Sequence, residues 1–565
     1  MKPVSRRALL GVSPLLAACE TRRARYFGKT DPPRSQELVY LLGAEPGTLD
    51  PAKSGDLWES PVIHAMFEGL TSIEPATGEP RAALATHYEA DSNGLRYVFR
   101  LRGHPRPRGI AFAAAEGSGI PARWSDGRPI TAQDFVYSWR RAVDPATAAP
   151  CAYLFYYIVN GEAITAGRQP PETLAVRAVD EFSVEVELAS PLPYLMGLLA
   201  TKSFFATPQH AIESAVRRGA GSSWIQPGNM VASGAFTLRE WRPYERIVLA
   251  RNPAYYDAGS VSLEHIRFLP VADGSASANL YRAGEAALCM PMSPHLMAGI
   301  SGMKDVRKCP NFGAHFPVMN TRKPPFSDVR VRYALNMATD KHAIGAFFGG
   351  GRTPLKGVVP PLDGYEPAKS LPVVMDGKTY DVLSYNPEAS RSLLIQAGYG
   401  PGLKFEYLYP AMPEFKPVAE ILQHQWRKNL GIDLALRSQE VQAWGQTVLE
   451  VAYNGVAAWA DVGGLEDPTW FLDQFRSTST VNGTGWTDRQ YDDLLAGAKA
   501  ITHPGQRLRK LAECERFLLQ AMPCLPLYTD VWVYLCKPFL KGITGDPFHG
   551  RMFNNARIDT NWRPS

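Results

Sequence analysis

The sequence predicts an α/β or α+β protein with more than one domain. Segments with the two-residue alternation of strands are interspersed along the chain with segments that repeat apolar residues at helical spacing. The chain has 565 residues, which is too long for a single hydrophobic core. Its hydrophobic content of 45% and charged content of 20% are typical of a globular protein.

Short apolar or alternating runs predict the strands. ELVYLL, residues 37–42, fits a buried strand, and LRYVFRLR, residues 95–102, alternates imperfectly. FSVEVEL, residues 182–188, alternates cleanly, because its apolar residues face one way while Ser183 and Glu185 face the other. This last pattern is typical of a strand that is buried on one face only.

Apolar residues at helical spacing predict the helices. TAQDFVYSWRRAV begins at Thr131, a candidate cap, and has Asp134 three residues later, as in a capping box. SDVRVRYALNMAT begins at Ser327, and NPEASRSLLIQAG has Asn386 as its cap and Gly398 as its stop. The apolar stripes of these segments are interpreted as core.

The first 35 residues predict an export leader and a tether. Residues 1–18 have a basic head and an apolar segment too short to cross a bilayer, which is typical of a cleaved signal peptide. The run that ends at Cys19 resembles a bacterial lipobox, whose cysteine is acylated. Residues 19–35 are polar and contain prolines, so they are interpreted as the tether. SRRALL also resembles a twin-arginine export motif, and packing of the apolar segment in the core is the alternative.

Cysteines and histidines give no sign of a metal site. No CxxC and no His-rich cluster is present, so we expect no bound metal. Export permits disulfides, but the sequence does not choose among the pairings of the six cysteines beyond Cys19. These six are Cys151, Cys289, Cys309, Cys514, Cys524 and Cys536.

Charge and motifs argue against nucleic-acid binding and against catalysis. The net charge of +5 is too small for a nucleic-acid surface. There is no GxSxG, HExxH, GxxxxGKS/T or GxGxxG, and SGMK, residues 301–304, lacks the KTG partner of SxxK enzymes. Paired carboxylates for glycoside cleavage remain open, because their spacing is spatial rather than sequential.

The segment AAWADVGGLEDPTWFLDQF, residues 457–475, places an acid where a buried strand meets a glycine loop. Small apolar residues and Trp459 lead directly to Asp461, and an Asp-Pro then opens an aromatic helical turn. An isolated acid of this kind is interpreted as a loop residue that caps the next element. Any further role depends on the rest of the chain.

Six separated stretches of the chain form an ordered set. They are EPGTLDP (45–51), FEGL (67–70), WSDGRPITAQDFVYSWRRAVDPATAAP (124–150), ASGAFTLREW with NPAYYD (232–257), KPPFSDVRVRYALNMATDK (323–341) and GTGWTDRQYDDLL (483–495). Together they resemble the solute-binding proteins of peptide-importing ABC transporters, the oligopeptide- and dipeptide-binding family. The resemblance covers most of the chain after the leader.

The resemblance implies an α/β, two-lobe periplasmic-binding-protein-like fold of type II, in the class of large peptide binders, with an extra subdomain. A hinge would join the lobes, and the ligand would be enclosed between them. Lobe I would comprise residues 36–67, 190–312 and 530–565, the subdomain residues 68–189, and lobe II residues 313–529.

Trp459-Ala460-Asp461 resembles the family segment whose aspartate binds the α-ammonium group of the ligand. The N-terminus is the positive charge that peptides of any sequence share, so one acid would fix the position of all of them. The backbone of Ala457, Ala458 and Trp459 would pair with the ligand as an added strand.

The resemblance also implies further lining residues. Gly55, Asp56 and Leu57 lie in the segment that the family uses for the opposite wall. Trp444 and Trp459 would line side-chain pockets, and packing of these tryptophans in the core is the alternative.

The implied protein is a monomeric receptor with no catalytic group and no metal or other cofactor. It would be periplasmic or on the cell surface, anchored to a membrane through acylated Cys19. It would deliver short peptides to permease subunits, whose partner ATPases hydrolyse ATP. Two alternatives remain open: a binder of a non-peptide solute (an oligosaccharide, a metal chelate or haem) on the same fold, and a secreted hydrolase.

Overall fold

The computed structural model describes residues 26–55, 57–74, 78–105, 108–113, 120–290, 299–348, 351–412, 414–463, 466–543 and 553–564. The predicted signal peptide, Cys19 and Asp56 lie outside these residues. Within them, no helix combines the length and the apolar character needed to cross a bilayer.

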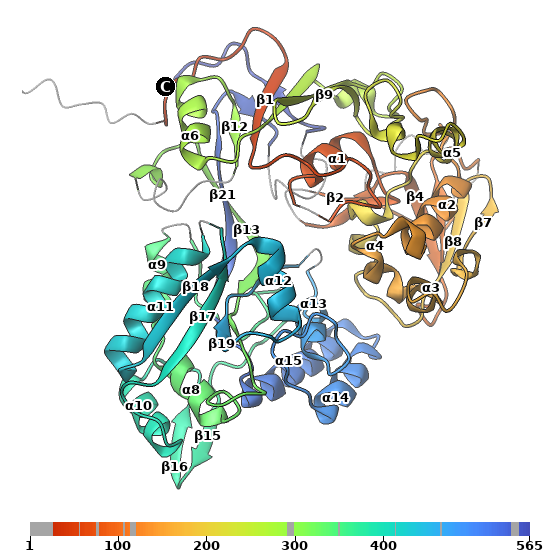
Figure 1. The fold of residues 1–565 in the computed structure, drawn as a ribbon. Helices are drawn as coiled ribbons and strands as arrows, with labels where there is room; N and C mark the ends of the chain where they lie inside the picture. The colour runs from red at the N-terminus through yellow and green to blue at the C-terminus, as the bar shows by residue number, and fades with distance from the viewer. Residues whose placement is uncertain are drawn as a thin grey trace, which may run out of the picture.

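The largest sheet of the described residues has eight strands and extends through both halves of the molecule (Figure 1). In spatial order the strands are β20 (Ala460–Val462), β13 (Val306–His315), β21 (Tyr528–Cys536), β12 (Leu288–Cys289), β1 (Glu37–Leu42), β11 (His265–Pro270), β10 (Arg246–Arg251) and β9 (Phe236–Arg242). Strand β1 confirms the prediction for ELVYLL. We call the part from β12 to β9, with the helices packed on it, lobe I.

Strands β13 and β21 run antiparallel from lobe I into the other half of the molecule (Figure 1). Their pairing is interrupted between Pro310 and Ala314, so that residues 311–313 of β13 lie opposite Asp530 of β21. A bulge of this kind bends a strand and disrupts the ladder locally. The chain therefore has a bending point where it passes between the two halves.

A five-stranded sheet among the described residues forms a subdomain beside lobe I (Figure 1). Its strands, in spatial order, are β6 (Ile110–Ala111), β4 (Ala85–Ala90), β5 (Arg96–Leu101), β8 (Ser183–Glu187) and β7 (Val176–Asp180). Strands β5 and β8 confirm the two remaining strand predictions.

The polar face of β8 is more buried than its alternation predicts. Ser183 and Glu185 are both buried. Glu185 forms ion pairs with Arg96 and Arg177, and Arg100 donates a hydrogen bond to Ser183 Oγ at 2.8 Å. Because arginines of the neighbouring strands cover these polar groups, most of β8 is buried on both faces.

A four-stranded sheet forms the centre of the second half, which we call lobe II (Figure 1). Its strands, in spatial order, are β14 (Val318–Met319), β19 (Gly455–Ala457), β17 (Lys404–Pro410) and β18 (Asp433–Gln439). Two hydrophobic clusters of described residues lie in this lobe, one around Trp426 and the other around Phe471 and Leu518.

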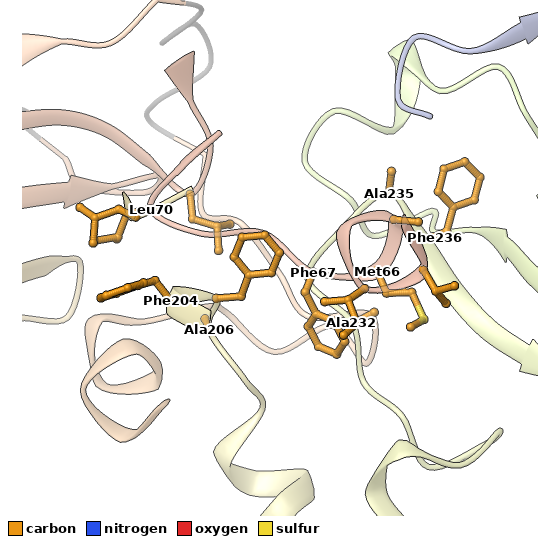
Figure 2. Packing of buried hydrophobic residues seen from close by; sticks show 14 of the residues in the cluster. Met66, Phe67, Leu70, Phe204, Ala206, Ala232, Ala235 and Phe236 are labelled. Atoms are coloured by element: carbon orange, nitrogen blue, oxygen red, sulfur yellow. The ribbon is translucent and has the colours of Figure 1, made fainter. Parts of the chain in front are cut away.

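Lobe I and the subdomain share one continuous hydrophobic core. Figure 2 shows the run from Met66 to Leu70 passing between the segment around Phe204 and the segment around Ala235. The Gly234 N–H donates to the Met66 carbonyl at 2.7 Å. The subdomain is therefore packed onto lobe I through buried side chains and backbone hydrogen bonds.

Local signals set the ends of two predicted helices. Helix α2 (Ala132–Val143) begins with the capping box formed by Thr131 and Asp134. Helix α10 (Pro387–Gln396) is capped by Asn386, whose side chain accepts a hydrogen bond from a backbone N–H in the first turn at 3.0 Å. Both predictions are confirmed.

The third predicted helix begins at Val329, two residues after Ser327, the first residue of the predicted segment. Asp328 caps α8 (Val329–Met337) by accepting a hydrogen bond from the Arg330 N–H at 2.8 Å. The described α-helices also include α1 (Ser60–Met66), α3 (Gly161–Thr165), α4 (Leu195–Leu198), α5 (Gln209–Arg217), α6 (Gly274–Ala283), α9 (Lys341–Phe347), α11 (Phe415–Leu430), α12 (Val441–Leu449), α13 (Thr469–Leu472), α14 (Arg489–Lys499) and α15 (Pro504–Ala521).

Short 3-10 helices and hairpins complete the described fold. The 3-10 helices are η1 (Pro145–Thr147), η2 (Ala152–Tyr157), η3 (Pro171–Thr173), η4 (Lys202–Phe204), η5 (Gly221–Ile225), η6 (Ala258–Ser260) and η7 (Asp473–Phe475). The two-stranded sheets are β2 (Thr71–Ile73) with β3 (Pro80–Ala82), β15 (Pro372–Met375) with β16 (Lys378–Asp381), and β22 (Leu540–Lys541) with β23 (Arg557–Ile558).

Candidate functional site

Asp461 lies on the edge strand of the large sheet, at its lobe II end. Strand β20 pairs with β13 on one side, with Asp461 opposite Ala314, and no other described strand pairs with its second side. After the glycine loop, α13 and η7 bring Trp470 and Gln474 back onto the Asp461 carboxylate. Because these two residues are four apart, they share one face of the helical segment.

Neutral donors surround the Asp461 carboxylate. Trp470 Nε1 donates to Oδ2 at 3.0 Å, and Gln474 Nε2 donates to the same oxygen. Burial raises the pKa of Asp461 to about 7, although the hydrogen bonds from Trp470, the Val462 backbone and Gln474 lower it. An ionised carboxylate accepts about four hydrogen bonds, so these donors leave capacity for a cation.

A row of aromatic rings runs along lobe II beside this group. The ring centroids of Trp459 and Trp444 lie 5.7 Å apart, those of Trp444 and Phe415 6.4 Å apart, and those of Phe415 and His315 5.9 Å apart. Trp459 Nε1 donates to Gln474 Oε1 at 3.1 Å. Among the described residues Trp444 Nε1 is buried without a hydrogen-bond partner. Both tryptophans are partly buried, which suits residues at the margin of a core.

Ala457 and Ala458 lie inside the lobe II sheet, which differs from the expectation of a free backbone edge. Ala457 lies between Val318 of β14 and Leu408 of β17. The Ala458 N–H donates to the Leu408 carbonyl at 2.7 Å. Because protein strands flank Ala457 on both sides, a ligand strand has no edge to pair with there. The edge beside Asp461 belongs to β20 instead.

Gly55 and Leu57 lie on lobe I, next to the segment that carries Tyr153. Leu57 packs against the shared core, and a Cβ added to Gly55 would lie 3.0 Å from Pro150 Cβ. Burial raises the pKa of the Tyr153 hydroxyl, and the charge of Asp461 adds to this shift. Tyr153, on the segment beside Gly55, therefore lies within electrostatic range of Asp461.

A charged cluster at the bulge of the crossing strands was not predicted. Asp530 Oδ2 accepts a hydrogen bond from Asn311 Nδ2 at 2.8 Å, and Oδ1 lies 3.5 Å from His315 Nε2 and 3.7 Å from Arg352 Nη2. Burial alone would raise the pKa of Asp530, but these partners together hold it below its ordinary value. A lone acid in the apolar run YTDVWVYLC was the signal in the sequence.

The described cysteines are free thiols, so the structure contains none of the pairings that the sequence left open. Burial raises the pKa of the Cys289 and Cys536 thiols to about 12, which makes them poor nucleophiles. In the described part of the chain, no group of three or more His, Cys, Asp or Glu side chains is arranged to hold a metal ion.

Two lobes joined by paired crossing strands, with a carboxylate where the lobes face each other, define a solute-binding protein. Residues 121–483 match the family described as "Bacterial extracellular solute-binding proteins, family 5 Middle". The chain belongs to this family, in its oligopeptide- and dipeptide-binding group. It is therefore an extracytoplasmic binding protein and not an enzyme.

Relatives match along nearly the whole chain. The periplasmic oligopeptide-binding protein OppA of Escherichia coli is 33% identical, over 93% of this chain and 92% of that protein. The probable deoxycholate-binding periplasmic protein YgiS of the same organism is 32% identical, over 96% of both. A structure of the E. coli murein tripeptide binding protein MppA matches with a TM-score of 0.77 and 30% identity, over 94% of this chain and 99% of that one. The predicted two-lobe fold is confirmed.

A second MppA structure, described as its unliganded open form, matches with a TM-score of 0.70 at 30% identity, over 94% of this chain and 98% of that one. Since both comparisons use the same relative, the difference in TM-score reflects the arrangement of the chain rather than its sequence. The described chain as a whole therefore superposes better on the first MppA structure than on the open form.

Proposed function

We propose that this chain is a lipid-anchored receptor that captures short peptides between its lobes and delivers them to the permease of an ABC importer. Asp461 binds the α-ammonium group of the peptide. Relatives named as oligopeptide-binding proteins support this ligand class. So does Haemophilus influenzae OppA, 28% identical, whose structure was solved in complex with the peptide RPPGFSPFR.

The surroundings of Asp461 support this role. The groups described around its carboxylate are neutral donors, and none of the described ion pairs includes it. Desolvation therefore raises the free energy of its charged form without compensation from a protein cation. A ligand that brings its own positive charge gains most from such a group.

The expected contribution of Asp461 is large enough to decide between ligands. A charge-assisted hydrogen bond contributes about 1.5–3 kcal/mol. Leaving an ammonium group buried and unpaired costs about 3–5 kcal/mol, which corresponds to at least about a hundredfold in affinity.

Calorimetry with tri-alanine and its N-acetylated form at pH 7.5 tests the proposal. We expect the free amine to bind and the acetylated peptide to bind at least about a hundredfold more weakly, because acetylation removes the charge that Asp461 pairs with. Asp461→Asn should abolish this preference. Asp433→Asn is the control, because Asp433 is exposed in lobe II and forms ion pairs only at the surface. Equal affinity for both peptides would contradict the role of Asp461.

A non-peptide solute is the second candidate. The aromatic row beside Asp461 would suit a sugar or an amphipathic molecule, and the 32% identical relative YgiS is described as a probable deoxycholate-binding protein. Native mass spectrometry of protein purified from its host separates the candidates. Mixed peptides that co-purify support the first, whereas a single sugar, chelate or bile-acid-like mass supports the second.

The membrane anchor is the third part of the proposal. Cys19 would be acylated, and the described chain begins a few residues later, where Phe27 is held on lobe I. The Phe27 N–H donates to Asp305 at 3.0 Å, and Lys537 Nζ donates to the Phe27 carbonyl at 3.1 Å. A membrane-bound protein would therefore keep lobe I close to the bilayer. Cys19→Ser should release the protein from the membrane fraction, and retention there would contradict the anchor.

The lobe boundaries are also proposed. Residues 36–67, 190–312 and 530–565 form lobe I, residues 68–189 the subdomain, and residues 313–529 lobe II. The positions of the sheets support this division, because the five-stranded sheet lies at 85–187 and the two inner boundaries fall within β13 and β21.

A further inference from the structure

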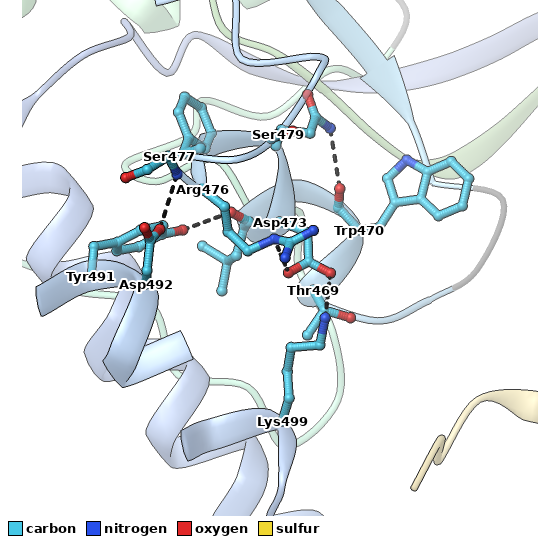
Figure 3. A network of polar contacts seen from close by, with 12 residues as sticks. Thr469, Trp470, Asp473, Arg476, Ser477, Ser479, Tyr491, Asp492 and Lys499 are labelled. Carbon is cyan, nitrogen blue, oxygen red and sulfur yellow. Dashed lines mark hydrogen bonds and ion pairs between the residues drawn. The ribbon is translucent and has the colours of Figure 1, made fainter. Parts of the chain in front are cut away.

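The short helical segment α13–η7 lies between the Asp461 carboxylate and side chains of the opposite half. On one side, Trp470 and Gln474 donate to Asp461 Oδ2, and Gln474 Nε2 also donates to the Trp470 carbonyl at 3.2 Å. Figure 3 shows this segment with the Trp470 ring directed away from the network around Asp473. That ring packs against the shared core of lobe I and the subdomain as well as against a core cluster of lobe II.

The other side of the segment meets two tyrosines of the opposite half. The hydroxyl oxygens of Thr469 and Tyr194 lie 3.3 Å apart, within hydrogen-bond distance. The rings of Tyr194 and Tyr157 pack edge to face, with centroids 5.9 Å apart. Lys499 Nζ lies 5.9 Å from the Tyr157 ring centroid, and the same ammonium group pairs with Asp473 at 2.7 Å. The contact therefore combines a hydrogen bond, aromatic packing and a cation.

The lobe II side of this contact is held rigidly. Arg507 binds Asp467 through two hydrogen bonds of 2.6 and 3.0 Å, and both side chains are buried. Asp467 Oδ1 accepts from the Thr469 N–H at 2.9 Å, and the Arg507 guanidinium carbon lies 5.9 Å from the Tyr194 ring centroid. A buried bidentate pair fixes geometry as well as charge, so Thr469 is presented to Tyr194 in one orientation.

We propose that α13–η7 is a latch that couples the occupancy of Asp461 to closure of the lobes, with Trp470 as the positioning residue and Tyr194 as the catch on the opposite half. A ligand cation that pairs with the Asp461 carboxylate fixes both its position and its charge, and Trp470 and Gln474 are bonded to that carboxylate. Hydrogen bonds to an ionised acceptor are roughly twice as strong as neutral ones. The bonds from Trp470 and Gln474 then strengthen and hold the segment where Thr469 meets Tyr194. This inference rests on the proposed role of Asp461.

The coupling must act in both directions. If binding at Asp461 favours the Thr469–Tyr194 contact, loss of that contact must weaken binding at Asp461 by the same factor. If the contact between the halves does not contribute to ligand binding, its loss would leave the affinity unchanged. The latch can therefore be tested by substitutions that leave Asp461 itself unchanged.

Two conservative substitutions test the latch. Tyr194→Phe removes only the hydroxyl, and Trp470→Phe removes the indole N–H while keeping a ring. Each is expected to raise the Kd of tri-alanine about three- to tenfold and to increase the radius of gyration of the ligand-free protein in small-angle X-ray scattering. Tyr156→Phe is the control, because Tyr156 lies on η2, is 41% exposed, and has Glu162 and Arg168 as its charged neighbours. It should change neither quantity.

The double variant decides whether the two residues act together. If they form one latch, the Kd of the double variant should lie within about twofold of the larger single effect. If the increase in Kd of the double variant equals the product of the two single increases, the coupling is overturned. If Tyr194→Phe has the same Kd and radius of gyration as the control, the role of Tyr194 is overturned. If the wild type does not bind tri-alanine, the proposed function fails. The radii of gyration of the same ligand-free variants then still show whether the contact between Thr469 and Tyr194 holds the two halves together.

Discussion

At the scale of single residues, two opposing effects determine the pKa of Asp461. Burial disfavours its charge, whereas Trp470, Gln474 and the Val462 backbone stabilise it, and the result is a pKa of about 7. The raised pKa means that the folded protein holds an extra proton between about pH 4 and 7 relative to the unfolded chain. The free energy of unfolding therefore falls as pH rises through this range, because Asp461 must ionise in a buried site. Binding of a cationic ligand at neutral pH offsets this loss.

Peptide affinity should follow this titration. Below pH 7 a proton must leave Asp461 before the ammonium group can pair with it, so affinity should fall about fiftyfold between pH 7 and pH 5. Above about pH 8 it should fall again, because the α-amine of the peptide loses its own charge. Calorimetry with tri-alanine from pH 5 to pH 9 measures this profile. A flat profile below pH 7 would show that Asp461 is not the acceptor, and Asp461→Asn should remove the acidic limb.

At the scale of elements, the bulge between β13 and β21 depends on side chains for its stability. Residues 311–313 have lost their regular partners in the ladder, and Asp530 lies opposite them. Its contacts with Asn311, His315 and Arg352 join the two crossing strands to the loop before Pro354. The side-chain contacts of Asp530 can therefore keep this bend ordered although the backbone pairing there is irregular.

Asp530→Asn should lower the free energy of unfolding by about 3 kcal/mol at pH 7, because the largely buried Arg352, with its side chain 16% exposed, would lose the acid that pairs with it. The pKa of Asp530 is lowered in the folded state, so its contribution is present above about pH 4 and is lost as pH falls below that value. Urea denaturation at pH 7 and at pH 3.5 measures both effects.

The difference in the free energy of unfolding between the wild type and Asp530→Asn should therefore be smaller at pH 3.5 than at pH 7. Glu245→Gln serves as the comparison, because Glu245 pairs with Arg246 at an exposed site. This change should leave the urea midpoint nearly unchanged at both pH values. An Asp530→Asn protein as stable as this control would mean that the cluster is dispensable.

At the scale of the whole molecule, the hydrophobic cores divide most of the described residues into two units. Lobe I and the subdomain share one cluster, whereas the clusters of lobe II are separate from it in the described residues. The strands β13 and β21 connect these units (Figure 1). Since the two units are linked by few elements, they can move relative to each other without disrupting either core.

Phe67→Ala should destabilise lobe I and the subdomain together. Phe67 is 1% exposed and lies in the shared core, so its truncation should cost about 3–5 kcal/mol. Hydrogen exchange measured by mass spectrometry should show faster exchange in β5 and in β10, with β17 of lobe II unchanged. Phe326→Ala, also 1% exposed but in a lobe II core, should give the reverse pattern. Faster exchange in the subdomain alone would contradict a shared core.

Sequence patterns predicted the elements better than the site. The capping box at Thr131 and the cap at Asn386 depend on residues three positions away, and both were predicted correctly. The burial of Glu185 was missed, because its arginine partners lie on neighbouring strands. Asp461 was singled out as a loop acid that caps the next element, whereas the structure places it in strand β20, and the donors that surround it were not predicted.

The sequence by itself determined the fold class, the family and the positions of three helices and three strands, because each depends on local periodicity or on motifs in a fixed order. Only the tertiary structure decided that Ala457 is enclosed by strands, that β20 is the edge beside Asp461, and that Asp530 pairs across the crossing strands. The reason is physical: the partners of a buried polar group come from distant parts of the chain. Packing selects them, and no pattern within a few residues records that choice.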